Sequence, residues 1–154
     1  MDGTHEERID YLLEYRDSMK KLQRYRAWME EHREKQVFSE YEGPGEKLSA
    51  PFPVYDSTLM SFVKEAKATP LMDKNYPYVY TRYHIRTPED ERRAIREAKA
   101  KDIDKLRGIL SKYVMGGQTK AAVWPQGVKE GIFAELLTKF AELSVVSGEP
   151  KELY

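Results

Sequence analysis

The stretch TPEDERRAIREAKAKDIDKLRGILSKYVMGG, residues 87–117, decides the fold class. Thr87 can cap a helix with its hydroxyl, and Pro88 suits the first helical position because an N–H there would have no helical partner. Acidic residues follow directly, where they meet the positive end of the helix dipole. Apolar residues then recur at helical spacing, at Ile95, Ala98, Ile103, Leu106, Leu110 and Tyr113. The sequence therefore predicts a helix that is capped again at Asp102 and ends at Gly116.

Upstream, residues 4–36 are predicted to form one long helix. Thr4 and Glu7 have the spacing of a capping box at its start. One apolar stripe then follows the helical period, at Ile9, Leu12, Tyr15, Met19, Leu22 and Met29. Such a helix would span roughly 45 Å, so part of it is expected to extend beyond the core. The near-heptad spacing of the stripe is also compatible with a homodimer.

Two of the following segments have simple predictions and one is ambiguous. Residues 42–55 are rich in glycine and proline, which predicts a loop. A short helix capped at Asp56 or Ser57 should follow. In residues 76–86, tyrosines at alternate positions favour a strand, whereas Pro77 could open a helix. We favour the helix because no second convincing strand is available to pair with it.

The C-terminal part predicts a short amphipathic helix after Thr119 and a last helix that ends before Gly148. Residues 149–154 are expected to be a tail. The fold class is therefore predicted as a mainly α, single-domain helical bundle, with the long helix 4–36 and a helical core over 56–148. A short β element at 76–86 is the alternative.

Composition excludes several classes of protein. The 154 residues carry 26 basic and 26 acidic side chains, 40% hydrophobic residues and no cysteine, which excludes disulfides and thiolate metal sites. No uncharged run exceeds eight residues, far below the roughly 18 that cross a bilayer. No signal segment is evident at the N-terminus. We therefore expect a cytoplasmic protein without a membrane span.

The residues that usually carry catalysis or metals lack the required spacing. His5, His32 and His84 have no partner at a spacing that would bind zinc or iron. No serine lies in a nucleophile elbow, and the loop at residues 116–120 follows a predicted helix rather than the strand of a phosphate-binding loop. The sequence therefore predicts no metal, no cofactor and no enzymatic activity.

Two features favour nucleic acid. Arg16, Lys20 and Arg24 lie at four-residue steps, so they share one helix face that could contact phosphates. Residues 119–137, which include Lys129, have the outline of a helix-turn-helix. The zero net charge and an apolar second helix argue against both features. The competing interpretations are a solvated charged face and a helical hairpin that closes the core.

Aromatic and basic residues favour a protein partner instead. An extended 76–86 segment would align its tyrosines and arginines as a platform, whereas a helix would bury most of them. Trp28 lies beside Lys21 and Arg24, away from the apolar stripe, so either the chain folds over it or it is an exposed anchor. Tyrosine, tryptophan and arginine are enriched at binding hot spots. The predicted partner-binding residues are Trp28, Arg24, Lys21, Tyr80 and Arg82.

Several short runs carry a resemblance to one family. They are ILSKYVMGGQTK (109–120), VW (123–124), GV (127–128), GIF (131–133), PVYDST (53–58) and YVY (78–80). The pattern resembles small uncharacterised proteins on mobile elements and prophages of gut anaerobes, a domain of unknown function. The resemblance covers about residues 50–145 and carries over no catalytic residue. It implies that the protein serves transfer, regulation or suppression of host defence.

We therefore expect a non-enzymatic protein that binds a macromolecular partner stoichiometrically. With the resemblance, the leading hypothesis is an inhibitor of a host-defence effector such as a CRISPR nuclease. The alternative is a nucleic-acid-binding regulator that uses the 119–137 hairpin or the basic face of the first helix.

Overall fold

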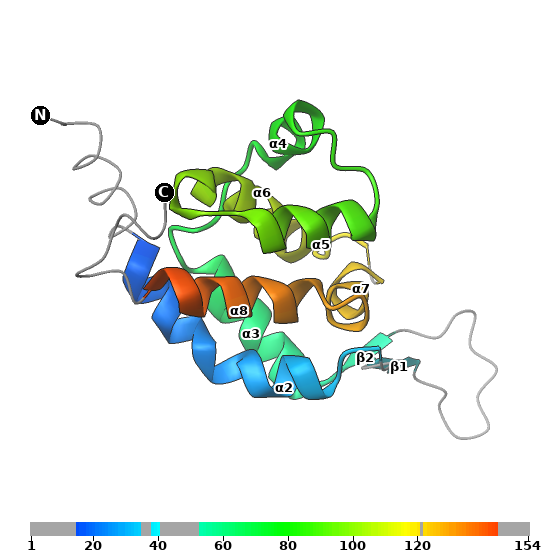
Figure 1. The fold of residues 1–154 in the computed structure, drawn as a ribbon. Coiled ribbons are helices and arrows are strands. Elements are labelled where there is room, and N and C mark those ends of the chain that lie inside the picture. The colour runs from blue at the N-terminus through cyan, green and yellow to red at the C-terminus, as the bar shows by residue number, and fades with distance from the viewer. Residues whose placement is uncertain (1–14, 35–37, 41–52, 121, 145–154) are drawn as a thin grey trace, which may run out of the picture.

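The computed structural model describes residues 15–34, 38–40, 53–120 and 122–144 (Figure 1). Over these residues the chain forms the mainly α-helical single domain that the sequence predicts. After the helical residues 15–21, the elements follow in the order η1 (Leu22–Tyr25), α2 (Arg26–Glu31), β1 (Phe38–Glu40), β2 (Pro53–Tyr55), α3 (Ser57–Lys67), α4 (Tyr76–Arg82), α5 (Pro88–Glu97), η2 (Ala100–Asp102), α6 (Ile103–Gly116), α7 (Val123–Lys129) and α8 (Ile132–Ser144).

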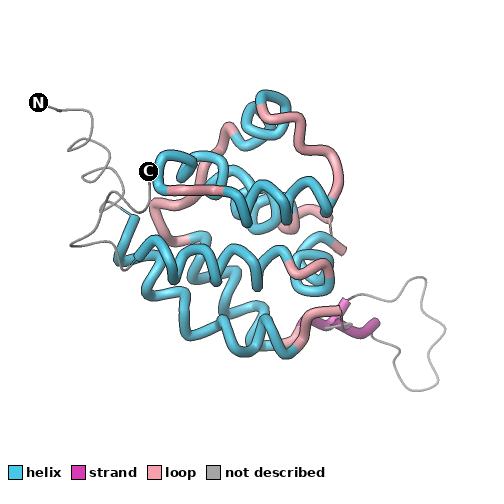
Figure 2. The backbone as a smooth tube through the Cα atoms, viewed as in Figure 1, coloured by secondary structure: helices cyan, strands magenta, loops and turns pink. Residues whose placement is uncertain are grey.

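The last helix is the central one. Figure 1 shows α8 between α5 on one side and α2 on the other, and it also packs against η1, α6 and α7. In contrast, α4 packs mainly against α6 and lies at an outer end of the molecule. The tube in Figure 2 shows the two strands on the side away from α4. The fold therefore has two ends, one formed by α4 and the other by α2, α3 and the strands.

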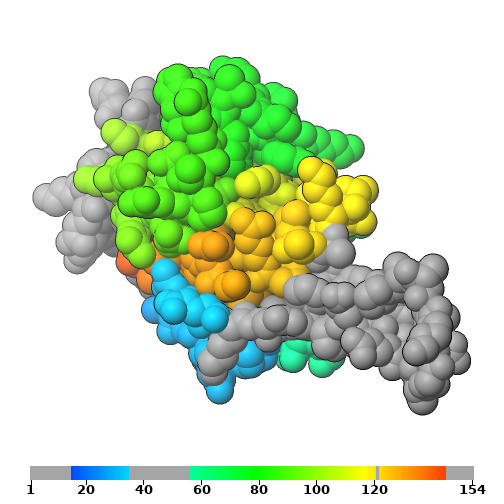
Figure 3. Space-filling model, turned by 90° about the vertical axis from the view of Figure 1, so that its right-hand side faces the viewer, coloured from blue at the N-terminus to red at the C-terminus, as the bar shows by residue number. Residues whose placement is uncertain are grey.

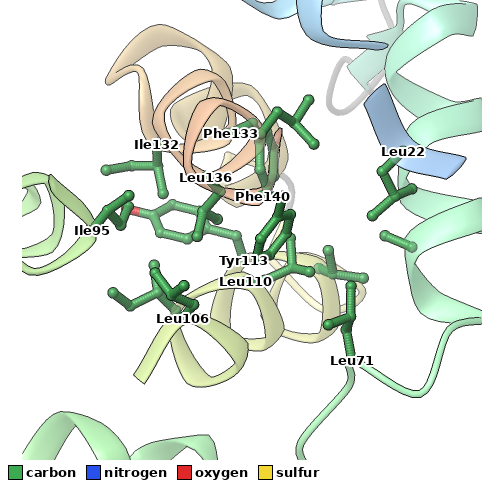
Figure 4. Close-up of a cluster of buried hydrophobic side chains, with 14 of the residues drawn as sticks. Leu22, Leu71, Ile95, Leu106, Leu110, Tyr113, Ile132, Phe133, Leu136 and Phe140 are labelled. Atoms are coloured by element: carbon green, nitrogen blue, oxygen red, sulfur yellow. The ribbon is translucent and has the colours of Figure 1, made fainter. Parts of the chain in front are cut away.

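Aromatic side chains from three helices fill the centre of the core. The ring of Phe133 on α8 lies 4.9 Å from that of Phe62 on α3 and 5.8 Å from that of Tyr113 on α6. Figure 4 shows Phe133, Phe140 and Tyr113 meeting there among aliphatic side chains. Residues from the first helix complete this core, since Met19, Leu22 and Met29 are fully buried. The described part of the first helix is therefore docked on the core.

Helix ends follow the capping signals in the sequence. Thr87 and Asp90 form the two bonds of a capping box at the start of α5. The side chain of Asp56 accepts a hydrogen bond of 2.7 Å from the backbone N–H of Thr58 at the start of α3. Between α7 and α8, Gly131 has a φ of 78°, which glycine adopts at little cost. The starts at Thr87 and Asp56 were predicted from local residues, and the structure confirms them, whereas the side chain of Asp102 does not cap α6 as predicted.

The end of the long first helix was predicted wrongly. Helical residues 15–31 include the 3₁₀ turn η1, but α2 ends at Glu31, five residues before the predicted end; residues 4–14 and 35–36 lie outside the described residues. The chain turns at Glu34, whose φ is 69° and whose N–H donates to the carbonyl of Lys129 at 3.0 Å. This stop depends on a distant residue, so no local pattern announces it.

Two other predictions about regular structure need correction. The predicted loop 42–55 ends in a strand, because residues 53–55 pair antiparallel with residues 38–40; residues 42–52 lie outside the described residues. The β alternative for 76–86 is wrong, since residues 76–82 form α4. As a helix, this segment packs against α6, in agreement with the helical interpretation.

Glu135 of α8 links α5 and the turn after α2 through ion pairs. This α8 side chain accepts hydrogen bonds from Arg33, after α2, at 3.0 Å and from Arg96 of α5 at 2.6 Å. The bond from Arg96, followed by that from Arg33, holds the pKa of Glu135 below its ordinary 4.5, against the opposing effect of burial. The folded chain therefore binds this proton less readily than the unfolded chain does.

We expect Glu135→Gln to lower the free energy of unfolding by about 1 kcal/mol at neutral pH, because both arginines are partly solvated. Since the folded pKa is lowered, the ion pairs stabilise the fold fully above pH 4.5 and lose their effect as the pH falls through that lowered pKa. Urea denaturation of both proteins from neutral pH to about pH 2 measures the difference. The control is Glu142→Gln, which removes an ion pair within α8 whose carboxylate is exposed. A loss that persists unchanged at about pH 2 would contradict the prediction.

Candidate interaction surface around α4

The helix α4 is held close to α6 by small and apolar side chains. Val79 is buried on the inner side of α4, directly over Gly108 of α6. A Cβ atom added to Gly108 would lie 2.7 Å from Val79 Cγ1, which no real contact tolerates. The absence of a side chain at Gly108 therefore lets the two helices approach. Pro77 in the first turn of α4 needs no helical hydrogen-bond partner, so it fits this start.

A buried carboxylate fixes α4 to α5 and α6. Glu91 of α5 is 1% exposed and accepts hydrogen bonds from the hydroxyls of Tyr80 at 2.7 Å and Tyr113 at 2.6 Å. The ammonium of Lys112 lies 3.1 Å from the same carboxylate. Burial, together with the charge and hydrogen bond of Glu91, raises the pKa of both tyrosines far above their ordinary value. The hydroxyls therefore stay protonated as donors, and α4 is anchored by a satisfied polar cluster.

With its inner side anchored, α4 presents aromatic side chains outward. Tyr78 is 54% exposed and Tyr83, directly after the helix, is 39% exposed. Among the described residues, Met60 on α3 is the other large hydrophobic side chain with comparable exposure. Figure 3 shows the green surface of α4 and its neighbours at the top of the molecule, away from the blue first helix. Exposed aromatic area is thus concentrated at one end of the fold.

Cations surround the exposed Tyr83. Lys105 Nζ lies 4.4 Å and Arg82 Cζ 5.4 Å from the centre of its ring, within cation–π range. His84, with a φ of 57°, turns the chain beside them and borders a hollow of about 220 Å³ between the residues after α4, α5 and Lys105 of α6. We call this region the α4 surface. It comprises Lys74, Tyr78, Arg82, Tyr83, His84, Arg86 and Lys105.

The residues predicted to bind a partner lie at two separate ends of the molecule. Lys21 and Arg24 both face Glu65 of α3, and Arg24 makes a hydrogen-bonded ion pair with it. Trp28 is partly buried against the core and stacks on His32 at 4.1 Å between ring centres. The other two predicted residues belong to α4, at the opposite end (Figure 1). The hydroxyl of Tyr80 donates to Glu91 in the buried cluster, whereas the side chain of Arg82 is exposed.

Two of the basic residues proposed for nucleic acid on the first helix have partners within the fold. Arg16 donates to the carbonyl of Ser144 at 2.9 Å, and Arg24 is paired as above, which leaves Lys20 exposed between them. The predicted hairpin is present as α7 and α8, and Lys129 is exposed at the end of α7. However, α8 is the buried central helix of the core. It therefore has no free side with which to enter a groove.

Sequence reasoning missed the residues that shape the α4 surface. Tyr83 and Lys105 are 22 positions apart, and only the fold brings the cation over the ring. Glu91 stands in a run of charged residues and looks like an exposed member of α5. A helical wheel of α5 would have given a signal, because Glu91 and the buried Ile95 are four residues apart and share one face.

Within the described residues, no three acidic or histidine side chains are arranged to hold a metal ion, and no helix is long and apolar enough to span a membrane. Comparisons of the chain with protein-family models, with curated proteins and with solved structures gave no match. The resemblance to mobile-element proteins therefore stays a prediction, and the proposals below depend on the geometry of the α4 surface.

Proposed function

We propose that the protein is a non-enzymatic binding protein that attaches to a protein partner in a 1:1 complex through the α4 surface. The observation that carries this proposal is the pair of exposed tyrosines, Tyr78 and Tyr83, beside cations on a helix that is anchored from below. Tyrosine offers a large contact area at a small cost in side-chain entropy, and its hydroxyl can also bond to the partner.

The anchoring of α4 favours binding. The Tyr80–Glu91 bond and the Val79–Gly108 contact hold the helix in place before a partner arrives. A surface that is already ordered loses less conformational entropy in the complex, so more of the contact energy appears as affinity. A loop bearing the same tyrosines would lose this advantage.

The kind of partner follows partly from the surface and partly from the sequence. Exposed aromatic side chains favour a protein partner. On the first helix, Arg16 and Arg24 already bond within the fold, which argues against a nucleic acid there. A host-defence effector such as a CRISPR nuclease is the partner class suggested by the resemblance, and this part of the proposal rests on the resemblance alone. The nucleic-acid alternative is supported by no comparable feature.

Photo-crosslinking from the surface itself tests the proposal. Benzoylphenylalanine replaces Tyr78 in one protein and Met60 in another, and both are expressed in the native host. We expect a 1:1 adduct with one protein from position 78 and none from position 60, which is similarly exposed on α3.

With that partner purified, Tyr78→Ala/Tyr83→Ala is expected to weaken binding at least about tenfold, whereas Met60→Ala should leave the affinity unchanged. Isothermal titration measures the affinity, and circular dichroism verifies that both variants fold. Equal affinity of the double variant and the unmodified protein, or absence of an adduct from position 78, overturns the proposal.

A further inference from the structure

We propose that the segment recognised by the α4 surface is an acidic stretch of protein, whose carboxylates pair with Lys74, Arg82 and Arg86. This inference rests on the proposed function and adds the chemistry of the partner. It comes from the distribution of charge rather than from the aromatic residues.

The segment that forms α4 and its flanks is one-sided in charge. Residues 74–88 contain Lys74, Arg82 and Arg86 and no acidic residue. The whole chain has 26 basic and 26 acidic residues, so the rest of it carries a net charge of minus three. The segment that bears the exposed tyrosines therefore carries three positive charges, although Asp90 and Glu97 of α5 line the hollow beside Tyr83. Such a patch steers an oppositely charged partner and fixes its orientation.

These three cations also form no ion pair within the part of the chain that the structure describes. Among the described residues, no carboxylate lies within ion-pair distance of Lys74, Arg82 or Arg86, and all three side chains are exposed. Elsewhere, arginines are paired within the fold, as Arg33 and Arg96 are with Glu135. An arginine without an internal ion pair can bind a carboxylate with two parallel hydrogen bonds.

A carboxylate-bearing protein fits this surface better than a nucleic acid does. Lys105 and Arg82 already lie against the ring of Tyr83, so a stacking base would compete with them for it. Glu89, 78% exposed in its side chain, stands directly beyond the basic segment. An anionic partner must therefore keep its charges away from this carboxylate. A protein can place its acidic residues singly, opposite the three cations.

A defined polyanion tests this chemistry without knowledge of the partner. The ¹⁵N-labelled full chain is titrated with poly-L-glutamate, with poly-L-lysine of equal length and with oligothymidylate at low salt. We expect poly-L-glutamate to shift the amide signals of residues 74–86, poly-L-lysine to leave them unchanged and oligothymidylate to bind more weakly. Arg82→Glu/Arg86→Glu should weaken poly-L-glutamate binding at least about tenfold, because two attractions become repulsions.

The matched control is Lys64→Glu/Lys67→Glu, which reverses two exposed charges on α3 and should leave the binding within about twofold. Tighter binding of oligothymidylate to the same residues, or equal losses from both charge reversals, overturns the acidic-partner inference. The proposed function fails separately. If Tyr78→Ala/Tyr83→Ala weakens binding of the crosslinked partner but poly-L-glutamate does not bind, the proposed function stands and only the inferred acidic chemistry of the partner is wrong.

Discussion

Replacing Glu91 by alanine is expected to lower the free energy of unfolding by roughly 3 kcal/mol, because two buried hydroxyls lose their acceptor at once. Tyr80 and Tyr113 donate to this carboxylate at 2.7 and 2.6 Å, and burial keeps water from replacing it. Lys112 is part-exposed and can turn to solvent, so its loss adds less. The destabilisation should be greatest at α4, whose Tyr80 then has no partner on α5.

Two further variants make this prediction specific. Glu91→Gln keeps an acceptor oxygen for one tyrosine and should therefore lose less stability than Glu91→Ala. Glu89→Ala removes an exposed carboxylate from the same first turn of α5 and should change stability by at most about 0.5 kcal/mol. Urea denaturation measures all three. Hydrogen exchange at the amides of residues 78–83 should quicken in Glu91→Ala, and equal stability of Glu89→Ala and Glu91→Ala would refute the assigned role.

How well each part of the fold could be predicted depends on whether the residues that define it lie close together in the sequence. Thr87 and Asp90 form their capping box within four residues, and the apolar stripe through Met19 and Leu22 turned inward as its period requires. The end of α2 could not be predicted in this way, because the bond from Glu34 reaches Lys129. The pairing of residues 38–40 with 53–55 is likewise non-local. Local patterns therefore define elements, and tertiary contacts set some of their ends.

The candidate site was less predictable than the fold. Tyr80 and Arg82 were predicted to bind a partner, but residue type alone does not tell an internal bond from an exposed contact. Tyr80 found a buried acceptor in Glu91, whereas Tyr78, two positions earlier, points to solvent. The difference is set by which side of a seven-residue helix faces α6. Since the sequence left helix and strand open there, it could not assign those sides.

Replacing Phe133 by alanine is expected to cost about 3–5 kcal/mol, the usual range for a fully buried phenylalanine. This ring joins α3, α6 and α8, with Phe62 and Tyr113 as its aromatic neighbours. It also lies against α7, because a Cβ atom added to Gly127 would come within 2.5 Å of Phe133 Cε2. Gly127→Ala alone should therefore be destabilising, by about 1–3 kcal/mol from overpacking.

The effects of the two substitutions on stability should not be additive. Gly127→Ala should destabilise the unmodified protein but stabilise the Phe133→Ala protein. Once Phe133 is alanine, the new methyl group at position 127 enters the space that the ring has left. Alanine also favours a helix over glycine by about 1 kcal/mol, and Gly127 lies inside α7. In the Phe133→Ala protein, Gly127→Ala is thus expected to raise stability by about 0.5–1 kcal/mol. Denaturant unfolding of the four proteins in a double-mutant cycle measures this reversal. If Gly127→Ala is equally harmful with and without the ring, the close packing of α7 on Phe133 is not what excludes a side chain at this position.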